Sequence, residues 1–131
     1  MNAAARAGPA YFAAVFAAGF VLGTIRVVAF VPRFGETASV LLEAPVILAV
    51  SWMASAWATR KFRVSNTALP RLLMGAVAFS LLMLAELGVS VFIFDRSIED
   101  HLAQYRSLPG LIGLFAQIVF AFFPLMQRHL R

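Results

Sequence analysis

The chain contains no cysteine and few charged residues, and both shortages exclude whole classes of protein. Without cysteine there can be no disulfide, thiolate metal site, iron–sulfur cluster or thiol nucleophile. His101 and His129 lie at opposite ends of the hydropathy pattern, so one chain cannot supply the facing pair that would hold a haem. The sequence also lacks a glycine-rich phosphate loop and a helical metalloprotease motif. We therefore expect neither a metal nor a cofactor, and no catalytic residue is assigned.

Apolar residues make up 62% of the 131 residues, and they gather in four long stretches. The stretches cover about 10–31, 37–59, 69–94 and 108–127. At about 1.5 Å per residue, twenty helical residues cross a hydrocarbon core of roughly 30 Å, whereas β-barrel strands would show alternating polarity. The first stretch lacks a small-residue cleavage pattern, so we expect it to be retained. The sequence predicts an all-α transmembrane four-helix bundle, with residues 1–131 forming a single integral membrane domain.

Basic residues are distributed unequally between the two ends of the predicted bundle. The end with both termini has seven basic residues and no acidic one: Arg6, Arg60, Lys61, Arg63, Arg71, Arg128 and Arg131. The other end mixes both signs: Arg33, Arg96 and Arg106 with Glu36, Asp95, Glu99 and Asp100. Short cytoplasmic loops are enriched in basic residues, so we predict that both termini are cytoplasmic. The net charge of +5 then reflects topology, and without a basic face we expect no nucleic-acid partner.

Each apolar stretch carries one polar or charged residue at a similar predicted depth. Helix geometry places Arg26, Glu43, Glu86 and Gln117 about 8, 10, 12 and 14 Å from the outer ends of their helices. These residues predict a polar layer in the outer half of the membrane. One arginine neutralises only one glutamate, and burial disfavours charge. We therefore expect a buried ion pair of Arg26 with Glu43 and a mostly neutral Glu86.

Each of these residues also has a purely structural interpretation. The long side chain of Arg26 can reach the outer headgroups by snorkelling. Glu43 can face a water-filled depression, and Glu86 can bond to Ser90 one turn away. Gln117 can form an ordinary hydrogen bond between helices. Under this interpretation the polar layer stabilises helix packing and has no further role.

Glycines and prolines predict local features of the helices beside this layer. The glycines with the helical spacing that allows close packing are Gly19, Gly23, Gly110 and Gly113. Pro45 cannot donate a hydrogen bond to the carbonyl of Leu41, so it predicts a kink one turn from Glu43. We expect a second kink at Pro124.

The loop between the third and fourth stretches contains the residue types of a metal site, namely Asp95, Glu99, Asp100 and His101. A structural interpretation is simpler. Ser97 followed by Asp100 is typical of a helix cap, and Ile98, Leu102 and Tyr105 form one apolar face. We therefore predict a short interfacial helix in this loop and no metal site.

Two strings, GTIRVVAFVPRFGETASVLLEAPVILAVSW and FDRSIEDHL, resemble small four-span inner-membrane proteins of proteobacteria that carry no assigned activity. The resemblance covers most of the chain. It implies a bacterial inner membrane, and it implies no mechanism, substrate or partner.

Three functions remain open. The first is a non-enzymatic structural or accessory membrane protein, acting as a homo-oligomer or with a membrane-protein partner, in which the polar layer fixes helix packing. The second is a small proton- or cation-coupled transporter or channel that uses Glu43 and Glu86, tuned by Arg26. The third is an intramembrane or outer-face enzyme that uses the same acids or the segment 95–101. We favour the first, because one four-helix bundle has little room for a transport path and shows no reaction motif.

Overall fold

The computed structural model describes residues 2–130, and within this range the chain is helical and contains no β-strand. In chain order the elements are α1 (Asn2–Ile25), η1 (Arg26–Phe30), α2 (Val31–Phe34), α3 (Glu36–Lys61), α4 (Ala68–Gly88), η2 (Val89–Ile93), α5 (Ile98–Ala103), η3 (Gln104–Arg106), α6 (Leu108–Met126) and η4 (Gln127–Leu130). The segments η1 and η2 are π-helical turns that continue α1 and α4. Four continuous helices in the described range are long and apolar enough to cross a membrane.

These four helices correspond to the four apolar stretches, which confirms the number of long helices predicted from the sequence. Three of them agree with the predicted bounds to within two residues: Glu36–Lys61, Ala68–Ile93 and Leu108–Met126. The first helix differs, because it begins at Asn2 instead of near residue 10. Its early start follows from the alanine-rich segment at 3–10, since alanine has the highest helix propensity.

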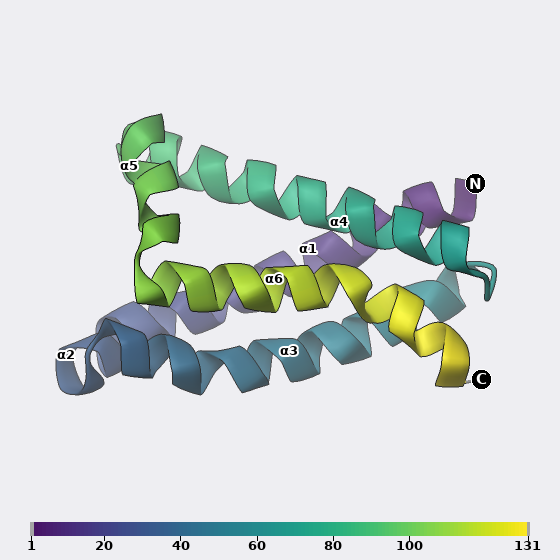
Figure 1. Cartoon of the computed structure of the whole chain (residues 1–131), viewed down its shortest axis with the longest axis horizontal. Coiled ribbons are helices and arrows are strands. Elements are labelled where there is room, and N and C mark those ends of the chain that lie inside the picture. The colour runs from purple at the N-terminus through teal and green to yellow at the C-terminus, as the bar shows by residue number, and fades with distance from the viewer. Residues whose placement is uncertain (1, 131) are drawn as a thin grey trace.

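The long helices form an antiparallel bundle of two hairpins (Figure 1). The first hairpin joins α1 to α3, and the second joins α4 to α6. Helix α1 packs against α3 and α4, and α6 packs against the same two helices on the opposite side. Both ends of the described chain lie at one end of the bundle, while α2 and α5 lie at the other.

A single residue makes the turn of the first hairpin. Gly35 has a φ of 83°, a left-handed conformation that glycine adopts without the penalty of a Cβ. Its N–H donates to the carbonyl of Val31 at 3.0 Å, and the hydroxyl of Ser39 donates to the carbonyl of Gly35 at 2.6 Å. The turn therefore holds the two arms of this hairpin close together.

Two serine caps shape the longer connection of the second hairpin. The Oγ of Ser97 accepts a hydrogen bond from the N–H of Asp100 at 3.0 Å, where α5 begins. The Oγ of Ser107 accepts one from the N–H of Gly110 at 3.2 Å, where α6 begins. The short helix predicted for this loop is present as α5, and its position at a membrane interface stays a prediction.

The bundle is closely packed only in the half next to the chain ends, which we call the packed half. Its hydrophobic core consists of Ala4, Ala7, Tyr11, Val15, Ala54, Ala58, Val64, Met74, Ala78, Leu82, Phe120 and Phe123. Gly8 and Gly75 allow the helices to approach. A Cβ at Gly8 would lie 2.8 Å from the side chain of Val77, and one at Gly75 would collide with the backbone carbonyl of Ala121.

The opposite half, which we call the cavity half, has no comparable core. Among its described residues, the buried ones are Ser39, Ser90 and His101. Its helices expose large apolar side chains, including Val28 and Phe92 with exposed fractions of 72% and 86%.

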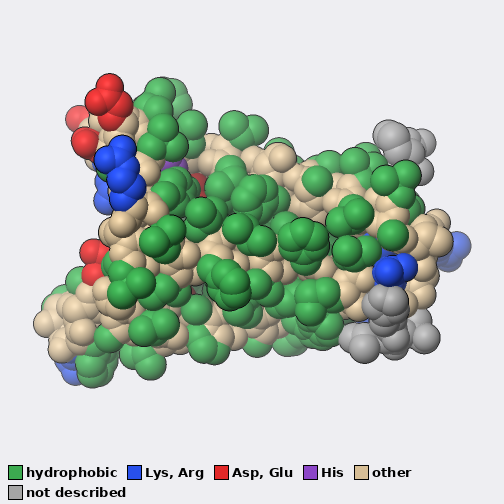
Figure 2. Space-filling view, in the orientation of Figure 1, with side chains coloured by type: hydrophobic (Ala, Val, Ile, Leu, Met, Phe, Trp, Pro, Cys, Tyr) green, Lys and Arg blue, Asp and Glu red, His purple; other side chains and the backbone are tan. Residues whose placement is uncertain are grey.

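The outer surface is apolar along the length of the bundle and charged at its ends (Figure 2). In this view hydrophobic side chains cover most of the visible face between the two ends. Acidic and basic side chains gather at the end with α2 and α5, whereas the charged side chains at the other end are basic. Water-soluble monomers rarely expose a continuous apolar surface of this kind, so it indicates a multi-pass membrane protein.

Candidate functional site

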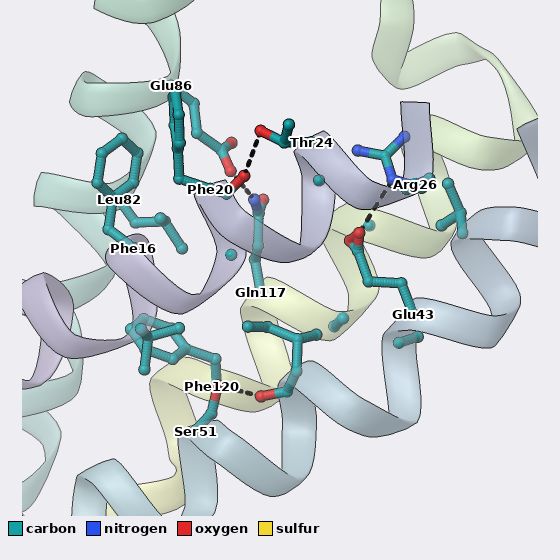
Figure 3. A pocket seen from close by; sticks show the side chains of 18 of the residues that line it. Phe16, Phe20, Thr24, Arg26, Glu43, Ser51, Leu82, Glu86, Gln117 and Phe120 are labelled. Carbon is teal, nitrogen blue, oxygen red and sulfur yellow. Dashed lines mark hydrogen bonds and ion pairs between the residues drawn. The ribbon is translucent and has the colours of Figure 1, made fainter. Parts of the chain in front are cut away.

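The cavity half encloses a cavity of about 510 Å³ between the two hairpins. All four long helices line it, and most of its wall is apolar (Figure 3). Phe20, Val27 and Val28 line the cavity and are also exposed on the outside of the bundle. The cavity therefore reaches the outer surface along the end of α1 and along η1.

The four residues predicted to form a polar layer all line this cavity. Arg26 lies at the start of η1, Glu43 in α3, Glu86 in α4 and Gln117 in α6. They belong to four different helices, yet they meet in two contacts, which are described next. The depths predicted from the helical rise per residue are therefore compatible with contacts between these residues.

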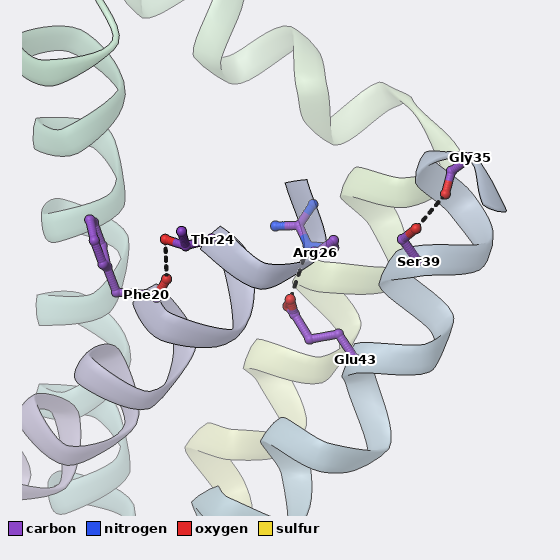
Figure 4. A network of polar contacts seen from close by, with 6 residues as sticks. All are labelled: Phe20, Thr24, Arg26, Gly35, Ser39 and Glu43. Carbon is purple, nitrogen blue, oxygen red and sulfur yellow. Dashed lines mark hydrogen bonds and ion pairs between the residues drawn. The ribbon is translucent and has the colours of Figure 1, made fainter. Parts of the chain in front are cut away.

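Arg26 and Glu43 form an ion pair within the first hairpin (Figure 4). The Nε of Arg26 donates to Oε1 of Glu43 at 2.9 Å. The side chains are 25% and 17% exposed, so the pair is partly open rather than buried as expected. The reason for this difference is the cavity itself, which leaves the end of the arginine side chain without close packing. No described residue accepts a hydrogen bond from the two terminal guanidinium nitrogens of Arg26.

Glu86 and Gln117 form the second contact, within the second hairpin. The Nε2 of Gln117 donates to Oε2 of Glu86 at 2.5 Å. The Oε1 of Gln117 is buried and has no hydrogen-bond partner among the described residues, and the same holds for the Oγ of Ser90. The alternative in which Glu86 bonds to Ser90 is therefore not realised. The interhelical hydrogen bond considered for Gln117 is present, and its acceptor is an acid.

The structure thus contains two side-chain pairs, Arg26 with Glu43 and Glu86 with Gln117. Each pair lies inside one hairpin, although each long helix also packs against a helix of the other hairpin. In the cavity half, no hydrogen bond or ion pair among described residues joins one hairpin to the other.

The glycines predicted to pack helices have a different role, which corrects that prediction. Gly19, Gly23 and Gly113 line the cavity. A Cβ at Gly113 would meet nothing within 4 Å, and one at Gly19 would make only an ordinary contact with Ile47 at 3.8 Å. Gly110 packs against the backbone of Gln104 in the preceding turn. Three of the four glycines therefore leave space for the cavity, because no side chain fills it there.

The two prolines predicted as kinks lie inside helices that continue past them. Helix α3 continues through Pro45 to Lys61, and α6 continues through Pro124 to Met126. The ribbon of α6 bends in its last turns (Figure 1), whereas the helix assignment stays unbroken at both prolines.

Pro124 has a consequence that the sequence interpretation missed. A proline has no N–H, so the carbonyl of Phe120, four residues earlier, loses its helical donor. The hydroxyl of Tyr11 donates to this carbonyl at 2.6 Å, and the two aromatic rings stack with their centroids 4.3 Å apart. The signal was available, since a proline inside an apolar helix always leaves one acceptor to be satisfied.

Other polar side chains of the packed half were also missed as structural residues. Arg71, counted among the basic residues at the end with both termini, is 1% exposed and donates to the carbonyls of Ser65 and Pro124 at 3.1 and 3.0 Å. Gln127 accepts from the hydroxyl of Ser55 at 2.8 Å and donates to the carbonyl of Trp52 at 2.9 Å. Their partners come from distant parts of the chain, so local patterns do not indicate them.

His101 lies buried in the loop that covers the cavity half. Its ring lies 3.2 Å from Nε2 of Gln104 and 3.5 Å from the hydroxyl of Tyr105. Burial lowers the pKa of His101, and the positive charge of Arg96 lowers it further. Among the described side chains, no three His, Asp or Glu residues are grouped so that they could hold a metal ion. The side chain of His129 and the whole of Arg131 lie outside the described residues.

The chain matches no protein-family model, no curated protein and no solved structure. The site is therefore interpreted from its own residues. These provide an apolar wall, one arginine, two acids and an amide, arranged around a space large enough for a small organic molecule.

Proposed function

We propose that the chain is a non-enzymatic integral membrane protein that crosses a bacterial inner membrane four times with both termini in the cytoplasm. Four long apolar helices and a continuous apolar surface support membrane insertion. The basic residues at the end with the termini support the orientation.

Its function in this proposal is to bind a hydrophobic or amphiphilic molecule in the cavity. The observation that carries the proposal is the cavity of about 510 Å³, which combines an apolar wall with two polar pairs. Phe20, Val27 and Val28 line it and face outward, where acyl chains would lie, so a ligand can enter sideways from the bilayer. A few polar groups in an otherwise apolar cavity are typical of small-molecule sites.

A purely structural role explains the polar layer less well. A layer that fixes helix packing should tie separate parts of the bundle together, as buried polar networks do. Here Arg26 with Glu43, and Glu86 with Gln117, each connect long helices that follow one another in the chain, so neither pair ties one hairpin to the other. The homo-oligomer or membrane-protein partner predicted from the sequence stays a prediction beside this function.

Transport is a second candidate, and the closure of one end of the cavity favours it. The packed half blocks the cavity towards the chain ends with Tyr11, Phe120 and Met74, while the cavity half is open. A site closed on one side and open on the other is what alternating access requires of a single state. In this function Glu43 and Glu86 would exchange protons or cations, and Glu86→Gln would abolish flux in a protein that still folds.

A matched pair of glycine substitutions tests ligand binding. Gly113 lines the cavity, whereas Gly88 does not, and a Cβ at either position meets nothing within 4 Å. Gly113→Leu should fill the cavity, and Gly88→Leu should leave it open. After purification from the native host in mild detergent, mass analysis should find a bound amphiphile with the wild type and Gly88→Leu but not with Gly113→Leu. Equal recovery of bound molecules from all three would overturn the proposal.

The absence of cysteine allows a clean test of orientation. Asn66 and Glu99 are exposed and lie at opposite ends of the bundle. In intact cells with a permeabilised outer membrane, an impermeant maleimide should label Glu99→Cys at once. Asn66→Cys should react only after the inner membrane is broken. The reverse pattern would overturn the proposed topology.

A further inference from the structure

The charges around the cavity do not balance within the protein. Arg26 is paired with Glu43, so this pair contributes no net charge. Glu86, on the opposite hairpin, bonds to the neutral amide of Gln117, and no described cationic side chain forms an ion pair with it. The lining therefore holds one acid without a matching base.

An ionised carboxylate in this position needs a compensating positive charge. Taking an ionised carboxylate out of water costs several kcal/mol, by rough general figures, unless an opposite charge compensates it. A proton can supply that compensation when the cavity is empty. A ligand with a positive charge can supply it when the cavity is filled, because it brings its charge next to the carboxylate and displaces the proton.

The wall around Glu86 suits the apolar body of such a ligand. Phe16, Phe20 and Phe120 line the same cavity, together with Leu82 from the helix that carries Glu86 (Figure 3). Aromatic faces attract organic cations as well as apolar groups, by about 0.5 to 2 kcal/mol for each favourable contact. One acid within an aromatic wall is thus complementary to a bulky molecule with one positive charge.

We propose that the cavity selects lipophilic monocations, with the positive charge beside Glu86 and the apolar body against the phenylalanine side chains. This inference rests on the proposed ligand-binding function and adds the charge of the ligand. An anionic amphiphile fits less well, because it would add a negative charge to a lining that already holds two acids and one arginine. The terminal nitrogens of Arg26 can donate to such an anion without breaking the Nε contact with Glu43, but the charge of Arg26 is already balanced by Glu43, so the negative charge of Glu86 and that of the anion would remain unbalanced together.

Two probe ions of nearly equal shape and opposite charge test the proposal. Tetraphenylphosphonium is the cation and tetraphenylborate is the anion. Each is equilibrated with the full chain in nanodiscs of zwitterionic lipid, and binding to protein-free nanodiscs is subtracted. Wild-type protein should bind the cation saturably, and Glu86→Gln should weaken the cation's affinity by about tenfold, which is the loss of one favourable charge interaction of about 1.4 kcal/mol. The affinity for the anion should not decrease in this variant.

Two further variants separate the effect of the Glu86 charge on binding from any effect of the substitution on folding. Glu99→Gln removes an exposed acid in α5 and should leave the cation affinity unchanged. Glu86→Asp keeps the charge and should retain most of the preference for the cation, so it keeps the test decisive if Glu86→Gln does not fold. Loss of cation binding in Glu86→Asp that matches the loss in Glu86→Gln would overturn the role of the charge.

The outcomes distinguish this inference from the proposed function. If both ions bind and Glu86→Gln changes neither, selection for cations is wrong while ligand binding stands. If neither ion binds the wild type above the level of empty nanodiscs, the inference fails. The co-purification result with Gly113→Leu then decides separately whether the cavity binds any other ligand.

Discussion

The packed half and the cavity half of the bundle use their polar residues in different ways. In the packed half, polar side chains bond between the hairpins: Tyr11 reaches the carbonyl of Phe120, and Gln127 bonds to Ser55 and Trp52. In the cavity half, Arg26 bonds within the first hairpin only. The Glu86 contact likewise stays within the second.

The polar residues of the packed half have a structural role, whereas those of the cavity half are available for the proposed binding role. Buried polar groups in a core must be satisfied, and doing so across the two hairpins joins them. The charged groups of the cavity half remain partly exposed and do not join the hairpins, so assembly of the bundle does not explain them. Four measurements test this difference, each comparing the two halves or examining one of them.

Glycine substitutions should give the largest difference. Gly75→Ala places a Cβ against the carbonyl of Ala121, and a backbone atom cannot move aside as a flexible side chain would. We expect a loss of about 3 kcal/mol in unfolding free energy, as for severe overpacking. Gly113→Ala should cause no loss, since its Cβ meets open space and alanine favours the helix. Thermal unfolding in detergent measures both, and equal effects would contradict the division into halves.

The second prediction concerns the hydrogen bond of Tyr11. Tyr11→Phe leaves the buried carbonyl of Phe120 without a donor, which should cost about 1 to 3 kcal/mol. Pro124→Ala restores the helical N–H to that carbonyl. In this background the loss caused by Tyr11→Phe should shrink to below about 1 kcal/mol, and a double-mutant cycle measures the difference. Additive effects of the two changes would show that the carbonyl does not depend on the proline.

The ion pair of the cavity half should contribute less. Arg26 and Glu43 are 25% and 17% exposed, so solvent and headgroups reduce their attraction. We expect a coupling energy of about 1 kcal/mol or less between Arg26→Gln and Glu43→Gln. A double-mutant cycle from equilibrium unfolding gives this value directly. A coupling above that of the Tyr11 contact would mean that the cavity half is held together by its charges.

The smallest effect should be a pH dependence of the loop over the cavity half. Because the pKa of His101 lies below its ordinary value of 6.5, the unfolded loop takes up a proton before the folded loop does. Stability is therefore complete above pH 6.5 and decreases as the pH falls below it. Hydrogen exchange in α5 should become faster at low pH in the wild type, after correction for the intrinsic rate. His101→Gln should flatten this dependence, and an unchanged slope would assign it to other groups.

The sequence predicts the helices well because each one depends on its own residues. Apolar length and the break at Gly35 define the first two helices, and the rise per residue places Arg26 level with Glu43. Periodicity does not state which helices are neighbours. For this reason the pairing of Glu86 with Gln117 could not be predicted from the sequence.

The contacts of the packed half could not be predicted from the sequence, for a different reason. The contact of Tyr11 with Phe120 joins residues 109 positions apart, and the contact of Arg71 with Pro124 joins residues 53 apart. Their acceptors are backbone carbonyls, which every residue has, so no residue pattern marks them. The cavity could not be predicted from the sequence either, because it arises where Gly19 and Gly23 of one helix and Gly113 of another leave space together.

The placement of each charged pair within a single hairpin determines how the molecule can deform. The two hairpins can lean apart at the cavity end without breaking a described hydrogen bond or ion pair, while the cross-links of Tyr11 and Gln127 hold them together at the other end. The cross-linked end then works as a pivot for two rigid arms. In the proposed ligand-binding function, molecules of different size would be accommodated by the angle between the arms, and no helix would have to unwind.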